Sequence, residues 1–244
     1  MDLRVVDGAG DTVALDLWLW RLDVAPAHRD ALAAHLEPGE RTRAAAYIRD
    51  LDRERFIVAR GRMREILGGY VGLAPKDVVL RPGSHGKPGL GEGPGGHGPS
   101  FNLAHAGGWA ALVAGPHALP LGIDIEPWRE VEQSVAERFF SASEREALGQ
   151  LEGATWTAGF FNAWTRKEAL LKAEGAGLSR PLDSFDVTLA PGAAARITRM
   201  TGGRGERWQL VPLELSPRFP GCIALRHSGE VRLTLREGTL PLPA

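Results

Sequence analysis

The sequence predicts an α+β fold with two similar subdomains, residues 1–117 and 118–244, each a small antiparallel sheet with one long helix packed on it. Two observations support this prediction. Each half combines stretches of alternating hydrophobicity with one long stretch of helical periodicity, in a loosely similar order and without a close sequence repeat. The length of 244 residues, 43% of them hydrophobic, allows one large domain or two small ones.

The first half begins with a strand and continues with a long helix. Residues 12–22, TVALDLWLWRL, alternate as a strand does, and apolar side chains recur at helical spacing over 41–70, before a stop at Gly72. The glycine- and proline-rich stretch 81–100 predicts a flexible loop. FNLAHAGGWAALVAG, residues 101–115, then predicts two strands joined by a turn at its paired glycines.

The second half repeats this order with different residues. PLGIDIEPW, residues 120–128, alternates as a strand, and Ser141 with Glu144 forms a capping box at the start of a helix. A long helix is predicted over 157–178, ending at Gly175 or Gly177. The segments FDVTL, RWQLVPLEL, GCIALRH and VRLTLRE are typical of short antiparallel strands.

Composition excludes several classes of protein. The formal net charge of −1 gives no field that would attract nucleic acid. A single cysteine, Cys222, excludes an internal disulfide framework and a cysteine-built zinc site, and a buried small residue is a simpler role for it than a nucleophile. MDLRVVDGAGD lacks the apolar core of a secretory signal, and no apolar run reaches the roughly 18 residues of a membrane span. We expect a cytoplasmic protein with no membrane or nucleic-acid partner.

Two acidic residues share one face of a predicted strand. In residues 120–128, Asp124 and Glu126 alternate with aliphatic side chains. Glu168 and Lys172, four residues apart, share a face of the long helix, and Lys167 lies beside that face. If the helix packs over the strand, three carboxylates meet, and hard oxygen ligands in that number suit Mg²⁺ together with a substrate phosphate.

Each feature also has a simpler interpretation. An Asp-x-Glu pair on a strand is usually the solvent face of a half-buried sheet. Glu168 with Lys172 matches an ordinary surface ion pair worth about 0.3–0.5 kcal/mol. His105 alone is more often a satisfied histidine than a functional one. Spacing by itself leaves both a metal–phosphate site and an ordinary surface open.

The joint pattern resembles the 4′-phosphopantetheinyl transferases, specifically their larger surfactin-synthetase type. The resemblance covers roughly residues 36–189 and fades in the last fifty residues. Two motifs are specific together: Gly-Ile-Asp-Ile-Glu, and Trp-x-x-Lys-Glu-Ala-x-x-Lys about forty residues later. The matching segments are GKP (86–88), FNLAHAGGW (101–109), LGIDIE (121–126), RFFSASE (138–144), FNAWTRKEALLKAEGAGL (161–178) and PLDSF (181–185).

The resemblance implies an enzyme of the holo-[acyl-carrier-protein] synthase type. Such a transferase moves the phosphopantetheine arm of coenzyme A onto a serine of an acyl or peptidyl carrier protein. It releases adenosine 3′,5′-bisphosphate and needs Mg²⁺, for which Mn²⁺ can substitute. Members of the larger type tend to serve secondary metabolism, including polyketide and nonribosomal peptide carriers. The sequence does not name the carrier.

Site residues follow from the matched positions. Asp124, Glu126 and Glu168 would bind the metal, Glu168 would also act as the base for the carrier serine, and Lys172 would steady the phosphate or protonate the leaving group. The positions implied to bind coenzyme A are Arg43, Arg55, Lys87, Pro88, His105, Lys167 and Lys172. Between residues 41 and 64, eight arginines face three acidic residues, which suits the 3′-phosphate but also an ordinary charged helix.

The chain departs from the family pattern where serines commonly flank the histidine. Here these positions are Ala104 and Ala106, which offer no hydroxyl to coenzyme A, and the sequence does not tell whether this alters its binding. The resemblance implies a monomer whose two subdomains are related by a pseudo-twofold axis, with the active site in the cleft between them. Two alternatives remain: a Mg²⁺-dependent phosphohydrolase of nucleotides or coenzyme A, and a binding regulator without turnover.

Overall fold

The computed structural model describes residues 12–83, 87–91, 93–94, 96–175, 180–200, 208–216 and 218–236. The helices are α1 (Pro26–Ala33), α2 (Pro38–Ala45), α3 (Asp50–Val71), α4 (Gln133–Phe139), α5 (Ala142–Gly149) and α6 (Gly153–Glu174). The strands are β1 (Thr12–Arg21), β2 (Leu80–Pro82), β3 (Pro88–Leu90), β4 (Ser100–Ala106), β5 (Trp109–Gly115), β6 (Leu121–Ile125), β7 (Phe185–Val187), β8 (Ile197–Met200), β9 (Trp208–Ser216), β10 (Phe219–Arg226) and β11 (Glu230–Leu235).

The first sheet has the strand order β11-β1-β5-β4. β1 pairs antiparallel with β5, and β5 with β4, but β11 pairs parallel with β1, for example Leu15 with Leu233. The prediction that VRLTLRE adds to an antiparallel sheet of the second half is therefore wrong. This strand crosses back from the second half and enters the first sheet in the same direction as β1.

The second sheet has the order β6-β10-β9, and all its pairs are antiparallel. Its register sets Asp124 of β6 beside Cys222 of β10, and Cys222 beside Pro212 of β9. Two-stranded ribbons, β2-β3 and β7-β8, complete the described sheets. All of the first ribbon except Leu80 lies inside the stretch 81–100 that is predicted as a loop, so part of that stretch forms an element after all.

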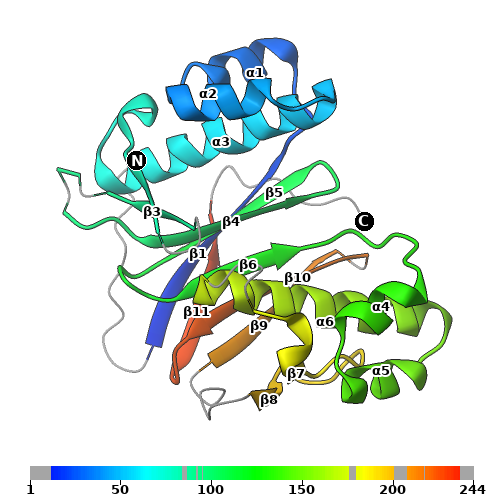
Figure 1. Ribbon diagram of the computed structural model, residues 1–244. Helices are drawn as coiled ribbons and strands as arrows, with labels where there is room; N and C mark the ends of the chain where they lie inside the picture. Colours follow the sequence, from blue (N-terminus) through cyan, green and yellow to red (C-terminus); the bar gives the residue numbers. More distant parts are fainter. Residues whose placement is uncertain are drawn as a thin grey trace.

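The elements stack in four layers (Figure 1). Aliphatic side chains such as Leu15 and Leu17 of β1 and Ile123 of β6 form one core between the two sheets. α3 covers the outer face of the first sheet, where Trp18 and Trp20 are buried. α6 covers the outer face of the second sheet, in a core that includes Cys222. This α+β arrangement of small sheets and long helices agrees with the predicted class.

Both long helices end as their sequences predict. α3 is followed by Gly72 (φ 68°) and α6 by Gly175 (φ 69°), left-handed conformations that favour glycine. The predicted capping box also forms, with Ser141 and Glu144 each bonding the other's backbone N–H. Within the described parts of the chain, no helix combines the length and the apolarity needed to cross a bilayer.

Candidate active site

β6 carries the first acidic residue of the site and is buried along its whole length. Leu121, Ile123 and Ile125 enter the core between the sheets, as the alternation predicts. The other face is covered by α6, not by solvent: a Cβ at Gly122 would lie 2.2 Å from the Ala169 carbonyl oxygen. Glycine therefore lets α6 lie directly against β6 beside Asp124.

Asp124 is a buried carboxylate with only one oxygen paired. Lys172 Nζ donates to its Oδ1 at 2.6 Å, while Oδ2 is buried without a hydrogen-bond partner. Burial raises the pKa of Asp124 to about 7; Lys172 opposes this rise, and the nearby carboxylates Glu126 and Glu168 add to it. The site thus holds more negative charge than its lysine neutralises.

The other two predicted metal ligands lie close enough to interact with Asp124. Glu126 follows β6 and its Oε2 accepts a hydrogen bond from Arg129 at 2.6 Å. Glu168 is half-buried on α6; burial raises its pKa, Lys172 lowers it, and Glu126 raises it further. Lys172 pairs with the Asp124 carboxylate and Arg129 with that of Glu126. In the described residues, no three His, Cys, Asp or Glu side chains come together as a ready metal-ligand cluster.

His105 joins the two halves electrostatically. It lies near the end of β4, before the tight turn at Gly107 and Gly108, whose φ angles are 56° and 80°. Desolvation lowers the pKa of His105 first, and the positive charges of Lys172 and Arg43 lower it further. Arg43 of α2 and Lys172 of α6 therefore both lie close enough to His105 of β4 for their charges to act on it.

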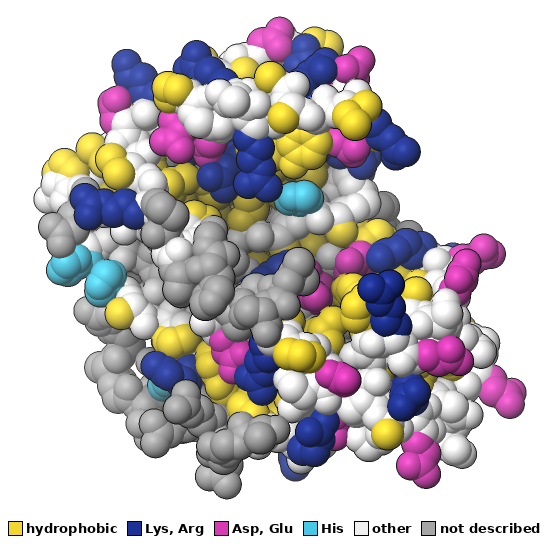
Figure 2. All heavy atoms as spheres, viewed as in Figure 1, with side chains coloured by type: hydrophobic (Ala, Val, Ile, Leu, Met, Phe, Trp, Pro, Cys, Tyr) yellow, Lys and Arg dark blue, Asp and Glu magenta, His cyan; other side chains and the backbone are white. Residues whose placement is uncertain are grey.

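The arginines of the first half lie on α2 and α3. Arg43 is exposed in the last turn of α2, with its guanidinium 5.3 Å from the centre of the Phe56 ring. Arg55 makes two hydrogen bonds to Asp23, at 2.7 and 2.9 Å, beside Gly108. Figure 2 shows Lys and Arg side chains and a histidine gathered on the upper side of an indentation, between α1–α3 and the body below.

Lys87 and Pro88 lie half-buried at the start of β3. Lys87 Nζ donates to the Leu121 carbonyl oxygen at 2.6 Å, and burial lowers its pKa to about 8. This lysine therefore touches β6 at the first residue of the strand that ends in the acidic group. Gly86, which precedes it in the GKP motif, lies outside the described residues.

Lys167 does not join the site. Its side chain is fully buried, 2.8 Å from Glu144, and it also donates to the backbone oxygens of Leu182 and Phe185. Adjacent helical residues point about 100° apart. While Glu168 faces the acidic group, Lys167 points into the core under α5 and β7, so its predicted contact with pyrophosphate is corrected to a structural ion pair.

Sequence reasoning missed three partners of the site. Asp23 pairs with Arg55 from 32 residues away, and Asn102 Oδ1 accepts a bond from the Ile123 N–H at 2.8 Å, which ties β4 to β6. No local signal reveals such distant contacts. Arg129 lies three residues after Glu126, a spacing that could have suggested their ion pair.

Comparison with known proteins identifies the family. The family model described as 4′-phosphopantetheinyl transferase superfamily matches residues 120–226. 4′-phosphopantetheinyl transferase HetI of Nostoc sp. (strain PCC 7120) is 37% identical over 213 residues, covering 86% of this chain and 86% of that protein. This chain belongs to the 4′-phosphopantetheinyl transferase superfamily. A second relative, 4′-phosphopantetheinyl transferase Sfp of Bacillus subtilis (strain 168), is 31% identical over 154 residues, 63% of this chain and 66% of that protein.

Membership in this superfamily confirms the predicted resemblance and gives the activity. A 4′-phosphopantetheinyl transferase moves a phosphopantetheine arm onto a carrier protein, and nothing in these relatives supports the phosphohydrolase alternative. The transferase motifs lie where the family match lies, because β6 and α6 both fall within residues 120–226.

Proposed function

We propose that this transferase takes the arm from coenzyme A and passes it to a serine of an acyl or peptidyl carrier protein, at a site shared by both halves of the chain. The observation that carries the proposal is the unpaired Oδ2 of Asp124. A buried carboxylate oxygen without a partner is costly, and here it lies beside Lys172 and two further carboxylates. These carboxylates and Lys172 are suited to bind a divalent cation together with the diphosphate of coenzyme A.

Asp124, Glu126 and Glu168 are the proposed ligands of Mg²⁺, with Mn²⁺ able to substitute. Their oxygens are the donor type that Mg²⁺ prefers, and the orphaned Oδ2 of Asp124 fits this role. The ion would supply charge neutralisation to the diphosphate of coenzyme A. Loading the site requires Lys172 and Arg129 to give up part of their contact with these acids.

Coenzyme A is proposed to lie across the indentation between the halves. Arg43 and Arg55 would take the 3′-phosphate, because a guanidinium can meet two phosphate oxygens at once. Lys87 and Pro88 would contact the adenine side, and His105 the diphosphate. The shared influence of Arg43 and Lys172 on His105 supports this path, because it brings cations of both halves to one place.

Proton transfer is assigned to the α6 residues. Glu168 is half-buried and its raised pKa makes it a better base than an exposed carboxylate, so it would accept the proton of the carrier serine directly or through a water. Lys172, with 31% of its side chain exposed, would then hold the departing phosphate and protonate it. The two residues are one turn apart on the same helix face, which lets one helix position both steps.

The chain organisation is proposed as two pseudo-twofold-related halves, residues 1–117 and 118–244, that act together as a monomer. Each half contributes a sheet with a long helix on its outer face, which supports the comparison between them. β11 is the exception to a clean division at residue 117, because it adds to the sheet of the first half. A cytoplasmic location remains our proposal.

The test is incubation of the protein with coenzyme A, Mg²⁺ and a panel of purified carriers, followed by intact-mass measurement. We expect at least one carrier to gain the mass of the arm, and omission of the metal to abolish the gain. Loss of coenzyme A without any labelled carrier would instead indicate hydrolysis.

Glu168→Gln separates the assigned chemistry from the fold. The substitution preserves the shape of the side chain but removes its charge and its function as a base. We therefore expect the rate of transfer to fall at least a hundredfold, since lost acid–base catalysis usually costs about 10²–10⁴-fold, while thermal stability stays unchanged. Glu146→Gln, an exposed glutamate on α5, is the matched control and should transfer normally. Transfer at the wild-type rate by Glu168→Gln would remove Glu168 from the catalytic role.

A further inference from the structure

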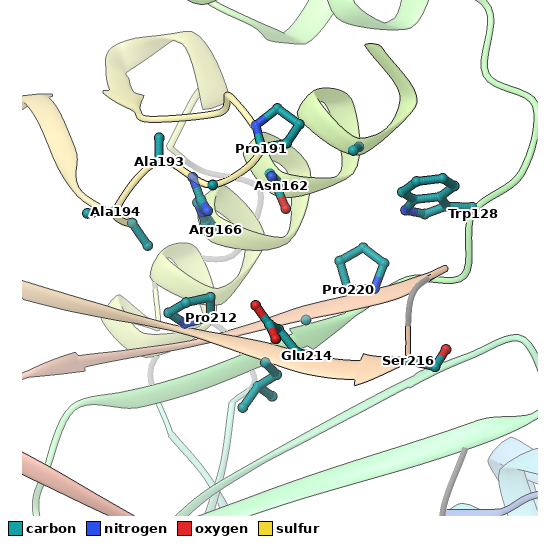
Figure 3. A pocket seen from close by; sticks show the side chains of 15 residues that line it. Trp128, Asn162, Arg166, Pro191, Ala193, Ala194, Pro212, Glu214, Ser216 and Pro220 are labelled. Carbon is teal, nitrogen blue, oxygen red and sulfur yellow. The ribbon is translucent and has the colours of Figure 1, made fainter. Parts of the chain in front are cut away.

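A second hollow, of about 650 Å³, lies in the second half on the β9 side of α6 (Figure 3). α6 contributes Asn162 and Arg166, which are four residues apart and share a face. Arg166 and Glu168 are two positions apart, which places them about 200° apart around the helix. The hollow is therefore separate from the catalytic acids, and none of those acids lines it.

The walls of this hollow are mostly apolar and made of small residues. Trp128 closes one side, the loop after β7 contributes Pro191 and a run of alanines, and β9 supplies Pro212 below (Figure 3). Small side chains along a loop leave room where larger ones would fill the space. A volume of this size falls in the range of small-molecule sites, about 300–1,000 Å³.

Arg166 places a buried positive charge at this hollow. Only 5% of it is exposed, and burial lowers its pKa. Among the residues that the structure describes, Arg166 donates hydrogen bonds from Nη1 alone, to the carbonyl and hydroxyl oxygens of Thr188. Within the described part of the chain no carboxylate forms an ion pair with Arg166, and the nearby Cys222 thiol is uncharged because burial raises its pKa to about 12.

No carboxylate among the described residues pairs with this guanidinium. Buried charges are normally paired, because taking an unpaired ion out of water costs several kcal/mol as an order of magnitude. Thr188 supplies dipoles but no negative charge. A carboxylate entering the hollow would neutralise Arg166, and the planar guanidinium suits two-pronged carboxylate binding.

We propose that this hollow binds a small organic monocarboxylate whose apolar body packs against Trp128 and the alanine-rich loop while its carboxylate meets Arg166. Glu214, exposed on β9, directs its carboxylate toward the same space (Figure 3). The negative charge of Glu214 repels ligands that carry several negative charges, such as nucleotides or coenzyme A. The hollow therefore differs from the catalytic site in the class of ligand that it would bind. The ligand needs one anionic group and an uncharged body.

The test uses the full-length protein with phenylacetate and hexanoate as probes and phenylacetamide as the neutral match, measured by isothermal titration and by tryptophan fluorescence. We expect the two carboxylates to bind at least tenfold more tightly than the amide. Equal binding of phenylacetate and phenylacetamide, or no binding of either carboxylate, would overturn the proposal.

Two variants locate the site. Arg166→Gln should weaken phenylacetate binding at least tenfold. Should that variant fail to fold, Ala194→Trp decides the question, because it fills the hollow from the exposed loop and leaves Arg166 in place. Ala190→Trp, in the same loop but outside the lining, is the matched control and should bind as the wild type does.

Arm transfer to the carrier should be unchanged in Ala194→Trp, since this residue lies outside the catalytic site. Normal phenylacetate binding by Ala194→Trp would contradict the location. Absence of arm transfer by the wild-type protein, with its phenylacetate binding intact, would count against the proposed function alone, so the two proposals fail independently.

Discussion

Lys172 Nζ lies 2.6 Å from Asp124 Oδ1, and this contact joins α6 to β6 at the centre of the proposed catalytic site. The two residues are 48 positions apart in sequence. Gly122 makes the contact attainable, since any side chain there would collide with the Ala169 carbonyl oxygen and, at 2.4 Å, with the Ala173 nitrogen. The distance between α6 and β6 therefore determines whether Lys172 can pair with Asp124.

The first prediction changes that spacing. Gly122→Ala should push α6 away from β6, lower the free energy of unfolding by about 1–3 kcal/mol as overpacking does, and reduce transfer because Lys172 no longer reaches Asp124. Urea unfolding and the carrier mass assay measure the two effects. Gly149→Ala, where a Cβ meets nothing within 4 Å, should lower neither. Wild-type stability in Gly122→Ala would show that the contact does not constrain the helix.

The second prediction concerns the 3′-phosphate of coenzyme A. Arg43→Ala should weaken coenzyme A binding at least tenfold, about 1.4 kcal/mol, and leave dephospho-coenzyme A binding nearly unchanged, because only coenzyme A carries that phosphate. Isothermal titration with both ligands measures the difference. Arg49→Ala, an exposed arginine beside the start of α3, is the control. Equal losses for both ligands would place Arg43 away from the phosphate.

Local patterns predicted several strands and the ends of the long helices, but they merged α2 and α3 into one helical stretch over 41–70 and predicted distant pairings poorly. The alternation in β1 and β6 and the stop signals at Gly72 and Gly175 depend on neighbouring residues, so they can be recognised in one sequence. The parallel pairing of β11 with β1 joins the two ends of the chain, and no local signal encodes it.

The site shows the same division. The sequence motifs assigned Asp124, Glu126 and Glu168 to one site, and the charges of these residues do influence one another in the structure. The motifs also assigned Lys167 to this site, although the direction of the Lys167 side chain depends on how α6 is rotated against the sheet. Rotation is set by packing of the whole helix, which spacing of charged residues alone does not determine.

The third prediction tests the structural role of Lys167. Lys167→Met leaves Glu144 buried and unpaired, so it should lower the free energy of unfolding by about 3–5 kcal/mol. Adding Glu144→Gln removes the stranded charge and keeps an amide oxygen that can accept one of the backbone N–H bonds that Ser141 and Val187 now donate to Glu144, so the double variant should recover part of the loss. Denaturant unfolding of the single and double variants measures the coupling.

Coenzyme A binding by the same double variant completes that test. Since Lys167 contacts Glu144 and two backbone oxygens, the refolded double variant should bind coenzyme A with wild-type affinity. A tenfold weaker affinity in a stable double variant would restore Lys167 to the phosphate site.

The last prediction is a pH dependence that comes from Lys87. Burial lowers its folded-state pKa to about 8 from the ordinary lysine value of 10.5, so between these values the unfolded chain binds more protons than the folded one. The unfavourable contribution of Lys87 to the free energy of unfolding is therefore complete below pH 8 and disappears as the pH rises toward 10.5.

Lys87→Met removes this contribution, so the stability advantage of the variant over the wild type should shrink steadily between pH 8 and 10.5. Thermal unfolding of both proteins across that range measures the change, and Lys76→Met, at an exposed lysine, should show no such trend. A constant difference between Lys87→Met and the wild type would mean that the bond to Leu121 keeps Lys87 charged throughout.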